Sequence, residues 1–480
     1  MVRLSEPAGR WVLVVTALGS GLVLLEGTVV QVALPALQHS LDASFGGLQW
    51  TVNAFALTLS GLILLGGGLG DRFGRRRVYL IGVALFTVAS VLCGAAPSIE
   101  WLIMARALQG VGGALVVPGS LALIQSSFHP DDRPRAIGLW AGLSGTAGAA
   151  GPLLGGGLVD TVGWRWVFLI NVPIAAVIAA LLVRHVPESR ADRPADRFDV
   201  AGALLAAVGS GGVTYALIQA GGTGWLAAAV GLVALVGFVR VERRTRSPIL
   251  PLGLFASRQF SAANLASFLL YGALAGLFFL LPIQLQITAG FTPLAAGLSL
   301  LPLTVLTLAL SGRAGALTAR LGPHLPLAAG SVACAVALLL AVRIGPQASY
   351  LTEVLPVVVL TGVGVPLITP PITATVLSAV PDSRAGVASA VNNGVARAAG
   401  LVVVAALPLL AGLPSDAARN PAALDSGFDA AMLICAGLYL LGGLVVWFGV
   451  PRRRPAAAAP EPVCRRHLST TSPQLEPARE

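Results

Sequence analysis

The chain contains a short, strongly cationic turn, GGLGDRFGRRR, at residues 67–77. Two long apolar runs flank this turn, roughly over residues 50–65 and 78–95. Because about twenty residues, each rising about 1.5 Å, cross a hydrocarbon core, both runs are predicted to be membrane-spanning helices. So tight a hairpin holds its arginines at one membrane face, and the positive-inside rule makes that face cytoplasmic.

The core of this turn carries more than positive charge, because glycines stand at fixed spacing around a single acid. Asp71 lies among arginines at a helix end, where a carboxylate can bond helix termini and guanidinium groups. We therefore expect a cytoplasmic gate here, although for Arg76 and Arg77 a purely topological role is equally open. The expected gate residues are Gly67, Asp71, Arg72, Gly74, Arg75 and Arg76.

Composition places the chain in the membrane. Its 480 residues are 56% hydrophobic and 11% charged, whereas soluble domains carry roughly 25% charged residues. The fold class predicted is an all-α polytopic membrane protein, so the formal charge of +10 is not read as a nucleic-acid signal. The four cysteines are scattered, with neither a disulfide framework nor metal-ligand spacing, and we expect no metal.

About fourteen spans are expected, and an even number places both termini on one side. About 26 arginines fall in the alternate set of loops assigned to the cytoplasm. Only Arg165, Arg343 and Arg419 lie in the other loops, while Arg106 and Arg397 lie within spans. Both termini are therefore predicted to be cytoplasmic, in the inner (cytoplasmic) membrane of the cell. The expected spans are 11–35, 47–70, 77–97, 101–124, 135–160, 165–184, 199–219, 224–240, 260–284, 293–312, 324–343, 350–374, 386–412 and 428–450.

The chain also repeats itself. The stretch GALTARLG at residues 315–322 has the spacing of GGLGDRFG at 67–74, with Ala319 in place of the acid. This repeat predicts two six-helix bundles related by an axis along the membrane normal, plus two extra central helices. The expected units are a cytoplasmic N-terminus (1–10), an N-terminal six-helix bundle (11–184), two inserted helices with cytoplasmic flanks (185–259), a C-terminal six-helix bundle (260–450) and a disordered cytoplasmic tail (451–480).

Four further stretches carry recognisable motifs: LEGTVVQVALP at 25–35, LIMARALQGVGGA at 102–114, GPLLGG at 151–156 and WRWVFLINVP at 164–173. With the hairpin, they resemble the fourteen-helix drug–proton antiporter branch of the major facilitator superfamily over nearly all of residues 11–450. The resemblance implies a secondary active transporter that exports lipophilic drugs, antibiotics or secondary metabolites in exchange for protons. It also implies no cofactor and no enzyme activity, and we expect a monomer in the lipid bilayer. Glu26 and Gln31 depart from the family, which usually has Asp and Asn there.

Glu26 is the only one of the 21 acids well inside an expected span, about 14 Å along the helix from Pro35. An ionisable group at this depth is a functional hypothesis by default. Desolvation disfavours its charged form, so Glu26 is expected to carry the coupling proton. A structural acid permanently paired with a base is the alternative. The resemblance implies that Arg106 lines the central cavity with Glu26, where it would tune this acid or hold an anionic substrate group; capping backbone carbonyls is its alternative role.

Other polar groups within spans are candidates for the substrate cavity, although interhelical bonding is the commoner role for each. The resemblance places Arg397 in the cavity of the second half, while packing against Asn393 is equally open. The candidates are Gln31, Trp50, Asn53, Gln109, Asn171, Asn392, Asn393 and Arg397. In the fifth expected span, small residues at three- and four-residue steps predict close helix contact, and a proline permits bending. The family assigns such a helix to the seal between halves, here with Gly151, Pro152 and Gly155.

Competing functions lack the residues they need. A pump driven by ATP needs a phosphate-binding loop with lysine, and all 31 basic residues here are arginine. An intramembrane enzyme needs metal ligands or a Ser/His pair within spans, and the five histidines lie in loops, at a span edge or in the tail. The partners expected are protons and a small organic substrate. The closest alternative is a metabolite exporter or a proton-coupled uptake symporter of the same fold.

Overall fold

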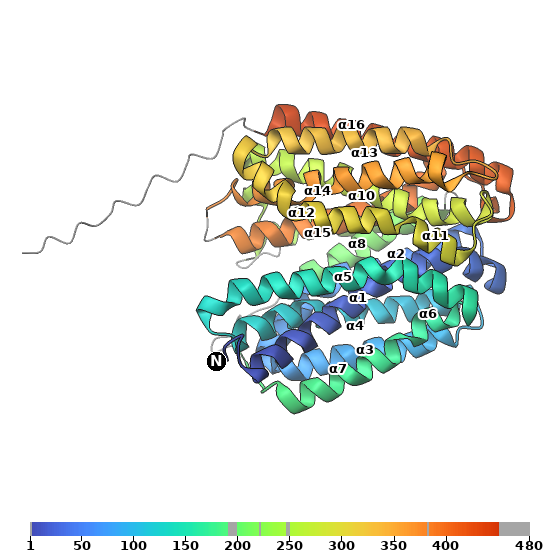
Figure 1. Ribbon diagram of the computed structural model, residues 1–480. Coiled ribbons are helices and arrows are strands. Elements are labelled where there is room, and N and C mark those ends of the chain that lie inside the picture. The colour runs from blue at the N-terminus through green and yellow to red at the C-terminus, as the bar shows by residue number, and fades with distance from the viewer. Residues whose placement is uncertain (1, 191–198, 220–221, 246–249, 382–383, 451–480) are drawn as a thin grey trace, which may run out of the picture.

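The computed structural model describes residues 2–190, 199–219, 222–245, 250–381 and 384–450, so the predicted disordered tail lies outside the described residues. The described chain is helical and its long helices run roughly parallel (Figure 1). The long helices are α1 (Pro7–Leu41), α2 (Phe45–Phe73), α3 (Arg75–Gly94), α4 (Ile99–Ser127), α5 (Arg133–Thr161), α7 (Asn171–His185), α8 (Val200–Gln219), α9 (Gly224–Arg244), α10 (Arg258–Ile287), α12 (Leu301–Leu321), α13 (His324–Ala341), α14 (Leu355–Leu377), α15 (Ala385–Leu410) and α16 (Pro421–Gly449). Short helical segments are η1 (Pro130–Asp132), α6 (Arg165–Leu169), η2 (Leu252–Ala256), α11 (Pro293–Ser299), η3 (Tyr350–Val354) and η5 (Ala417–Arg419).

Local chemistry explains where several helices begin and end. The Ser44 side chain accepts a bond from the Gly47 amide at 3.2 Å and caps α2, because the first amides of a helix have no partner within it. Asn420 caps α16 in the same way, through the Ala423 amide at 3.2 Å. Gly74 and Gly322, equivalent positions in the two copies of the hairpin sequence, end α2 and α12 with φ of 111° and 77°. Those positive angles favour glycine at both sites.

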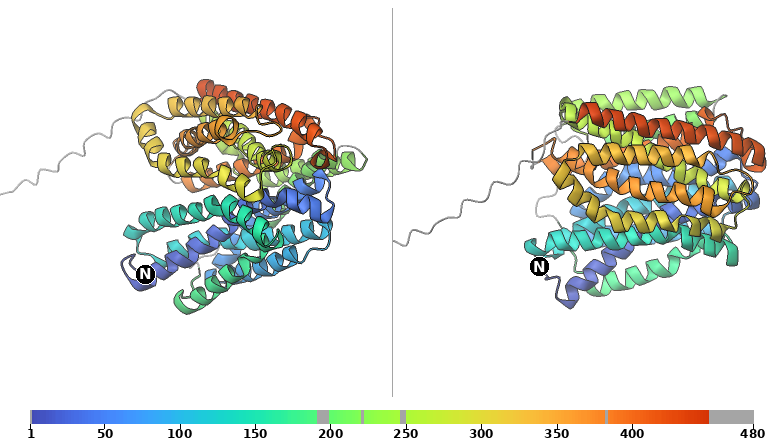
Figure 2. Two further views of the ribbon diagram at one scale, coloured as in Figure 1. Left: turned by 45° about the vertical axis from the view of Figure 1, so that its right-hand side comes forward. Right: turned by 45° about the horizontal axis from the view of Figure 1, so that its top comes forward.

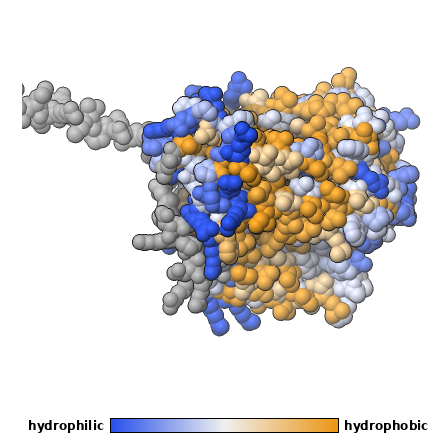
Figure 3. Space-filling model, turned by 90° about the horizontal axis from the view of Figure 1, so that it is seen from below, coloured by the Kyte–Doolittle hydropathy of each residue, from blue (hydrophilic) through white to orange (hydrophobic). Residues whose placement is uncertain are grey.

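The expected membrane fold is confirmed at the level of a polytopic helical protein. Within the described residues, 12 helices are long and apolar enough to cross a membrane, or 13 if the bent α2 is one span. The two parts of α2, Phe45–Ile63 and Leu65–Phe73, meet at 50°. This number is smaller than the expected fourteen because α5, with 29 residues, falls outside it. Glycines throughout α5 lower its hydropathy. A broad apolar band lies between hydrophilic ends in Figure 3.

The helices form two groups, which are separated by colour in Figures 1 and 2. In the N-terminal group, α1 packs on α5, and α4 packs on both α2 and α3. In the C-terminal group, α10 packs on α15 and α16, and α13 packs on α14 and α16. The remaining pair, α8 and α9, packs together, and α8 contacts both α2 and α15. This pair therefore lies across the boundary between the groups.

Hydrogen bonds between the two groups gather at one end of the molecule. We call the end that contains residues 67–77 the hairpin end and the opposite end the far end. At the far end, the Gln286 Nε2 donates to the Val32 carbonyl at 2.9 Å, and the Phe45 amide donates to the Ser415 carbonyl at 2.9 Å. Arg419 pairs with Asp42, also between groups. Within the described residues, no such bond between groups is found at the hairpin end, so the far end is the closed one.

Candidate functional site

The centre of the site is a buried ion pair between α1 and α4. Glu26 is 0% exposed and Arg106 is 1% exposed. The Arg106 Nη1 donates to the Glu26 Oε1 at 2.5 Å. Two ions removed from water are tolerated only when they are paired and fully hydrogen-bonded, so the groups around them decide whether this pair is stable.

Three helices, α2, α4 and α7, supply these groups. The Asn171 Nδ2 donates to the second oxygen of Glu26, Oε2, at 2.6 Å. The Arg106 Nε donates to the Thr51 carbonyl at 3.0 Å, and its Nη1 also donates to the Gln109 Oε1 at 2.6 Å. Both carboxylate oxygens are therefore bonded, and the pair ties α1 to α2, α4 and α7.

Further contacts fix the orientation of this network. The Gln109 Nε2 donates to the Ser90 hydroxyl at 2.9 Å, which adds α3. The guanidinium carbon of Arg106 lies 4.4 Å from the ring centre of Phe55 and 5.8 Å from that of Phe168, distances at which cation–π attraction operates. Among the described groups the Asn171 Oδ1 has no hydrogen-bond partner.

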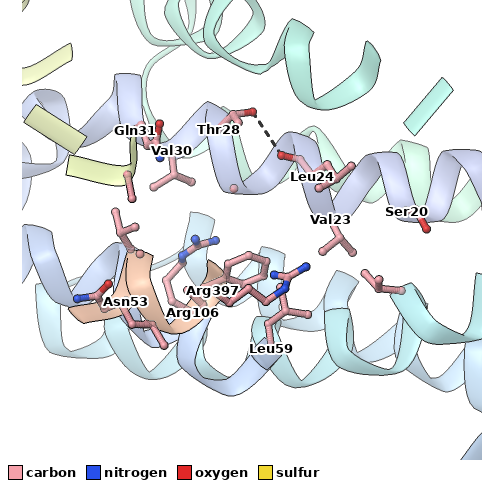
Figure 4. A pocket seen from close by; sticks show the side chains of 18 of the residues that line it. Ser20, Val23, Leu24, Thr28, Val30, Gln31, Asn53, Leu59, Arg106 and Arg397 are labelled. Atoms are coloured by element: carbon pink, nitrogen blue, oxygen red, sulfur yellow. Dashed lines mark hydrogen bonds between the residues drawn. The ribbon is translucent and has the colours of Figure 1, made fainter. Parts of the chain in front are cut away.

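A cavity of about 530 Å³ lies next to this network, between the two groups of helices (Figure 4). Its walls come from α1, α2, α4 and α5 on one side and from α10 and α15 on the other. Arg106 lines the cavity, but Glu26 does not, which corrects the expectation that both residues do so. The physical reason is that Arg106, Asn171 and the surrounding helices enclose the carboxylate completely.

Three of the expected cavity residues line this space, namely Gln31, Asn53 and Arg397. No hydrogen bond joins the side chains of Arg397 and Asn393, and the Asn393 Nδ2 donates instead to the Ser389 carbonyl of its own helix at 3.0 Å. Asn393 is exposed and lies outside the cavity wall. No hydrogen bond or ion pair of Arg397 is formed with any described residue.

The other candidates lie elsewhere, so their expected place in the cavity is corrected. Gln109 and Asn171 belong to the buried network behind Arg106. Asn392 is buried within the C-terminal group, where its amide donates to the Ser267 hydroxyl at 2.6 Å. Trp50 lies one turn nearer the far end than Asn53, and its ring centre is 6.1 Å from that of Tyr215 on α8. Each side chain is thus bonded or packed between helices.

The hairpin residues are held together by hydrogen bonds within the N-terminal group. The Asp71 Oδ1 accepts from the Arg75 Nε at 2.9 Å and from its Nη2 at 2.7 Å. Glu188, which follows α7, accepts from the backbone amides of Arg76 at 3.0 Å and Arg77 at 3.2 Å. A carboxylate at the first amides of a helix stabilises that end, so Glu188 caps α3.

The remaining hairpin residues have simpler environments. The Arg72 guanidinium carbon lies 5.7 Å from the ring centre of Phe73. A side chain at Gly67 would contact Pro118 on α4 at 3.5 Å. At Gly74 it would meet the carboxylate of Glu188 at 2.8 Å, so the turn and this cap exclude a larger residue.

Helix α5 is packed closely on two sides. A Cβ atom at Gly151 would overlap the Thr28 hydroxyl on α1, and one at Gly155 would lie 2.7 Å from the Val29 carbonyl. On its other side the Pro152 carbonyl faces Gly297 of α11, in the C-terminal group. The Asp160 Oδ2 accepts from the Leu294 amide at 2.9 Å and joins the same two helices. The seam between α5 and α11 therefore closes the far end.

Three residues that bond to the Arg106 network or to the hairpin were not predicted from the sequence. Ser90 and Thr51 complete the Arg106 network, but a lone hydroxyl or carbonyl within an apolar span gives no distinguishing signal. Glu188 gave a weak signal, since it is an acid in an arginine-rich stretch directly after a span. Its position at the hairpin depends on where α7 ends relative to α3.

A family model described as Major Facilitator Superfamily matches residues 16–405. The chain is 35% identical to the puromycin resistance protein pur8 of Streptomyces alboniger over 471 residues, covering 94% of this chain and 93% of the relative. It is 36% identical to the methylenomycin A resistance protein of Bacillus subtilis, covering 95% and 97%. It is 38% identical to the multidrug resistance protein Stp of Mycobacterium tuberculosis over 391 residues, covering 79% and 72%.

Solved structures with low sequence identity share the fold. A peptide transporter, POT, in complex with sulfate aligns with a TM-score of 0.69 at 15% identity, covering 93% of this chain and 95% of that one. A bacterial homolog of the human lysosomal transporter Spinster, in an inward-facing and occupied conformation, aligns with a TM-score of 0.66 at 16% identity, covering 93% and 97%. At these identities the likeness concerns the arrangement of helices alone.

Proposed function

Because the chain belongs to the Major Facilitator Superfamily, a family of transporters and not of enzymes, we propose that it is a proton-driven exporter of lipophilic drugs, antibiotics or secondary metabolites. Its relatives named for resistance to puromycin, methylenomycin A and multiple drugs support this proposal. The observation that carries it is the buried Glu26–Arg106 pair behind the wall of a cavity that both groups of helices build. A carboxylate in this position can link proton binding to a rearrangement around the cavity.

The network around Glu26 supports a role as the proton carrier. When the carboxylate is ionised, it accepts from Arg106 and from the Asn171 Nδ2. When a proton binds, its hydroxyl needs an acceptor, and the unpartnered Asn171 Oδ1 supplies one after the amide turns over. Protonation also removes the charge that holds Arg106, which lines the cavity and is then free to change partners.

We also infer the topology. Helix α5 runs along α1 through the N-terminal group, so we propose that it crosses the membrane as well and brings the total to about fourteen. The arginines of the hairpin support cytoplasmic termini, and the closed far end then faces outward. We therefore propose that the structure is the inward-facing conformation, with the cavity closed on the outer side. We propose the same division of the chain that the sequence repeat predicts, into residues 1–10, 11–184, 185–259, 260–450 and 451–480.

Transport in inverted membrane vesicles tests this function. A gradient that is acidic inside the vesicle should drive a fluorescent lipophilic substrate inward, which corresponds to export from the cell, and collapse of the gradient should stop it. The alternative, an uptake symporter of the same fold, moves substrate in the direction of the protons and so out of these vesicles. Movement against the proton flow would establish antiport, and movement with it would overturn the proposal.

Gly156 tests whether the α5–α11 seam is a moving seal. A Cβ atom at this position would overlap the Pro293 carbonyl and lie 2.8 Å from the Leu294 Cα, both on α11. Gly156→Val should therefore prevent closure of the far end and shift the protein toward the outward-open conformation. The neighbouring Gly157→Val is the matched control, because a Cβ there comes no closer than 3.9 Å to α11.

Single cysteines measure this shift, in a background with the native cysteines replaced. One is placed at Ala141, an exposed residue of the cavity wall, and one at Gln286, which bonds Val32 across the far-end seam. In the Gly156 variant, thiol labelling at position 286 should rise several-fold and labelling at position 141 should fall. Equal labelling in both valine variants would show that the seam does not open.

Asp71 tests the cytoplasmic gate by the same labelling. We propose that Asp71 and the adjacent arginines hold the hairpin end shut when the cavity faces outward, so Asp71→Asn should raise labelling at position 141. Its bond to Arg75 in the inward-facing state is partly exposed, and loss of such a pair costs less than about 1 kcal/mol. Asp131→Asn, which breaks an exposed pair with Arg3 at the same end, is the control. Unchanged labelling in a folded Asp71 variant would leave this acid only a topological role.

A further inference from the structure

The cavity between the two groups of helices carries positive charge and no acid. Arg106 and Arg397 line it, and none of its lining residues is Asp or Glu. The charge of Arg106 is compensated by Glu26 from behind the wall. No acid in the described part of the chain pairs with Arg397, so the cavity presents one uncompensated guanidinium.

Asn53 also lines the cavity, and it carries a second unpartnered donor. Asn53 is 1% exposed, and its Nδ2 has no hydrogen-bond partner among the described residues. Two of the lining hydroxyls donate to backbone carbonyls, Thr28 to Gly148 at 2.8 Å and Ser144 to Ala17 at 3.2 Å, and the Ser20 Oγ accepts from the Trp140 Nε1 at 3.1 Å. Buried polar groups need partners. Arg397 and the Asn53 Nδ2 offer hydrogens, and the Gln31 amide, which forms no hydrogen bond with a described residue, offers both a donor and an acceptor.

The rest of the wall is mostly apolar. Val23, Leu24 and Val30 of α1 face the cavity in Figure 4, and Leu401 and Val404 line it from the C-terminal group. Such a wall binds a lipophilic body through burial of apolar surface, while a few polar groups fix its orientation. A ligand that completes this site therefore combines an apolar body with a negatively charged group that accepts hydrogen bonds.

We propose that the cavity selects lipophilic acids, with a carboxylate, sulfonate or acidic hydroxyl bound by Arg397 and assisted by Asn53. This inference rests on the proposed export function and names its substrate class. A planar guanidinium binds an oxyanion through two parallel hydrogen bonds, and such charge-assisted bonds are stronger than neutral ones. A lipophilic cation finds no counter-charge in the cavity wall and would be repelled by the uncompensated guanidinium of Arg397.

The test compares three probes of similar lipophilic character. Anilinonaphthalenesulfonate carries a permanent negative charge, phenylnaphthylamine has nearly the same aromatic body without charge, and tetraphenylphosphonium is a cation. Binding to the purified full-length protein and gradient-driven uptake into inverted vesicles are both measured. The native protein should bind the sulfonate about tenfold more tightly than the neutral probe, which is the strength of one hydrogen bond to a charged group.

Two variants assign the effect to the cavity. Arg397→Gln should weaken sulfonate binding about tenfold and change neutral-probe binding less than twofold. Arg320→Gln removes an exposed arginine at the end of α12 and should change neither. Preference of the native protein for the phosphonium, or equal loss of sulfonate binding in both variants, would overturn the inference. If the inference fails but the neutral probe or the phosphonium still shows gradient-driven uptake, the proposed export function remains supported. If no probe shows gradient-driven uptake, the result contradicts the proposed export function itself.

Discussion

Glu26→Gln is expected to abolish uphill export while leaving a folded protein in the membrane. Glutamine has nearly the same shape and can still accept from Arg106, and its amide can donate to the Asn171 Oδ1 once the Asn171 amide turns over. It cannot bind and release a proton, so the link between the proton gradient and substrate movement is lost. Gradient-driven transport in inverted vesicles should fall to background, a reduction of at least about a hundredfold, comparable to the loss of an essential proton-transfer group.

Two controls separate coupling from folding and from substrate binding. Glu26→Asp keeps the carboxyl group on a shorter side chain and should retain part of the activity. Glu353→Gln makes the same chemical change at the far end, where the carboxylate accepts, among the described residues, only from the Ser349 amide, and should transport normally. Substrate binding at equilibrium should survive in Glu26→Gln, because Glu26 does not line the cavity. Full gradient-driven transport by the Gln variant would exclude Glu26 as the essential proton carrier.

The ion pair shows which part of the site can be predicted from a single sequence. Depth within an expected span singled out Glu26 and Arg106, because an isolated charge in hydrocarbon is costly and a partner at matching depth relieves that cost. The structure joins them directly. The same reasoning did not show that Arg106 lies between the carboxylate and the cavity, because depth along a helix does not determine which way its face turns.

The cavity residues illustrate the same limit. Asn392 and Asn393 are adjacent in an apolar helix and looked alike in the sequence, yet one is bonded inside the C-terminal group and the other is exposed. Successive residues on a helix point about 100° apart, so only the packing of neighbouring helices decides which side chain meets the cavity. Glu188 was missed for a related reason, since its cap on α3 joins segments that are distant in sequence.

The conformation could not be predicted from the sequence at all. Alternating access requires that one chain stabilise two arrangements of nearly equal free energy, so its motifs serve both states. The hairpin motif predicted a gate, but here Asp71 bonds Arg75 within its own group and the bonds between groups lie at the far end. Those bonds involve Val32 and Ser415 through their backbone carbonyls, which any residue supplies.

Arg106→Leu is expected to have the largest effect on stability. It leaves the Glu26 carboxylate completely buried without its counter-charge and removes a donor from the Thr51 carbonyl and from Gln109. Removing one partner of a buried ion pair typically costs about 3–5 kcal/mol. The purified variant should therefore unfold at a markedly lower temperature, and expression in the membrane should fall with it.

A double variant decides whether this loss comes from the stranded charge. In Glu26→Gln/Arg106→Leu the acid is gone, so the double variant should be more stable than Arg106→Leu alone, with an interaction energy of about 1–3 kcal/mol in the cycle. Arg106→Lys retains a positive charge but cannot donate to Glu26, Gln109 and the Thr51 carbonyl in the same planar geometry, so it should fall between native and Leu. Equal stability of the Leu variant and the double variant would mean that Arg106 acts through its packing against Phe55 rather than through its charge.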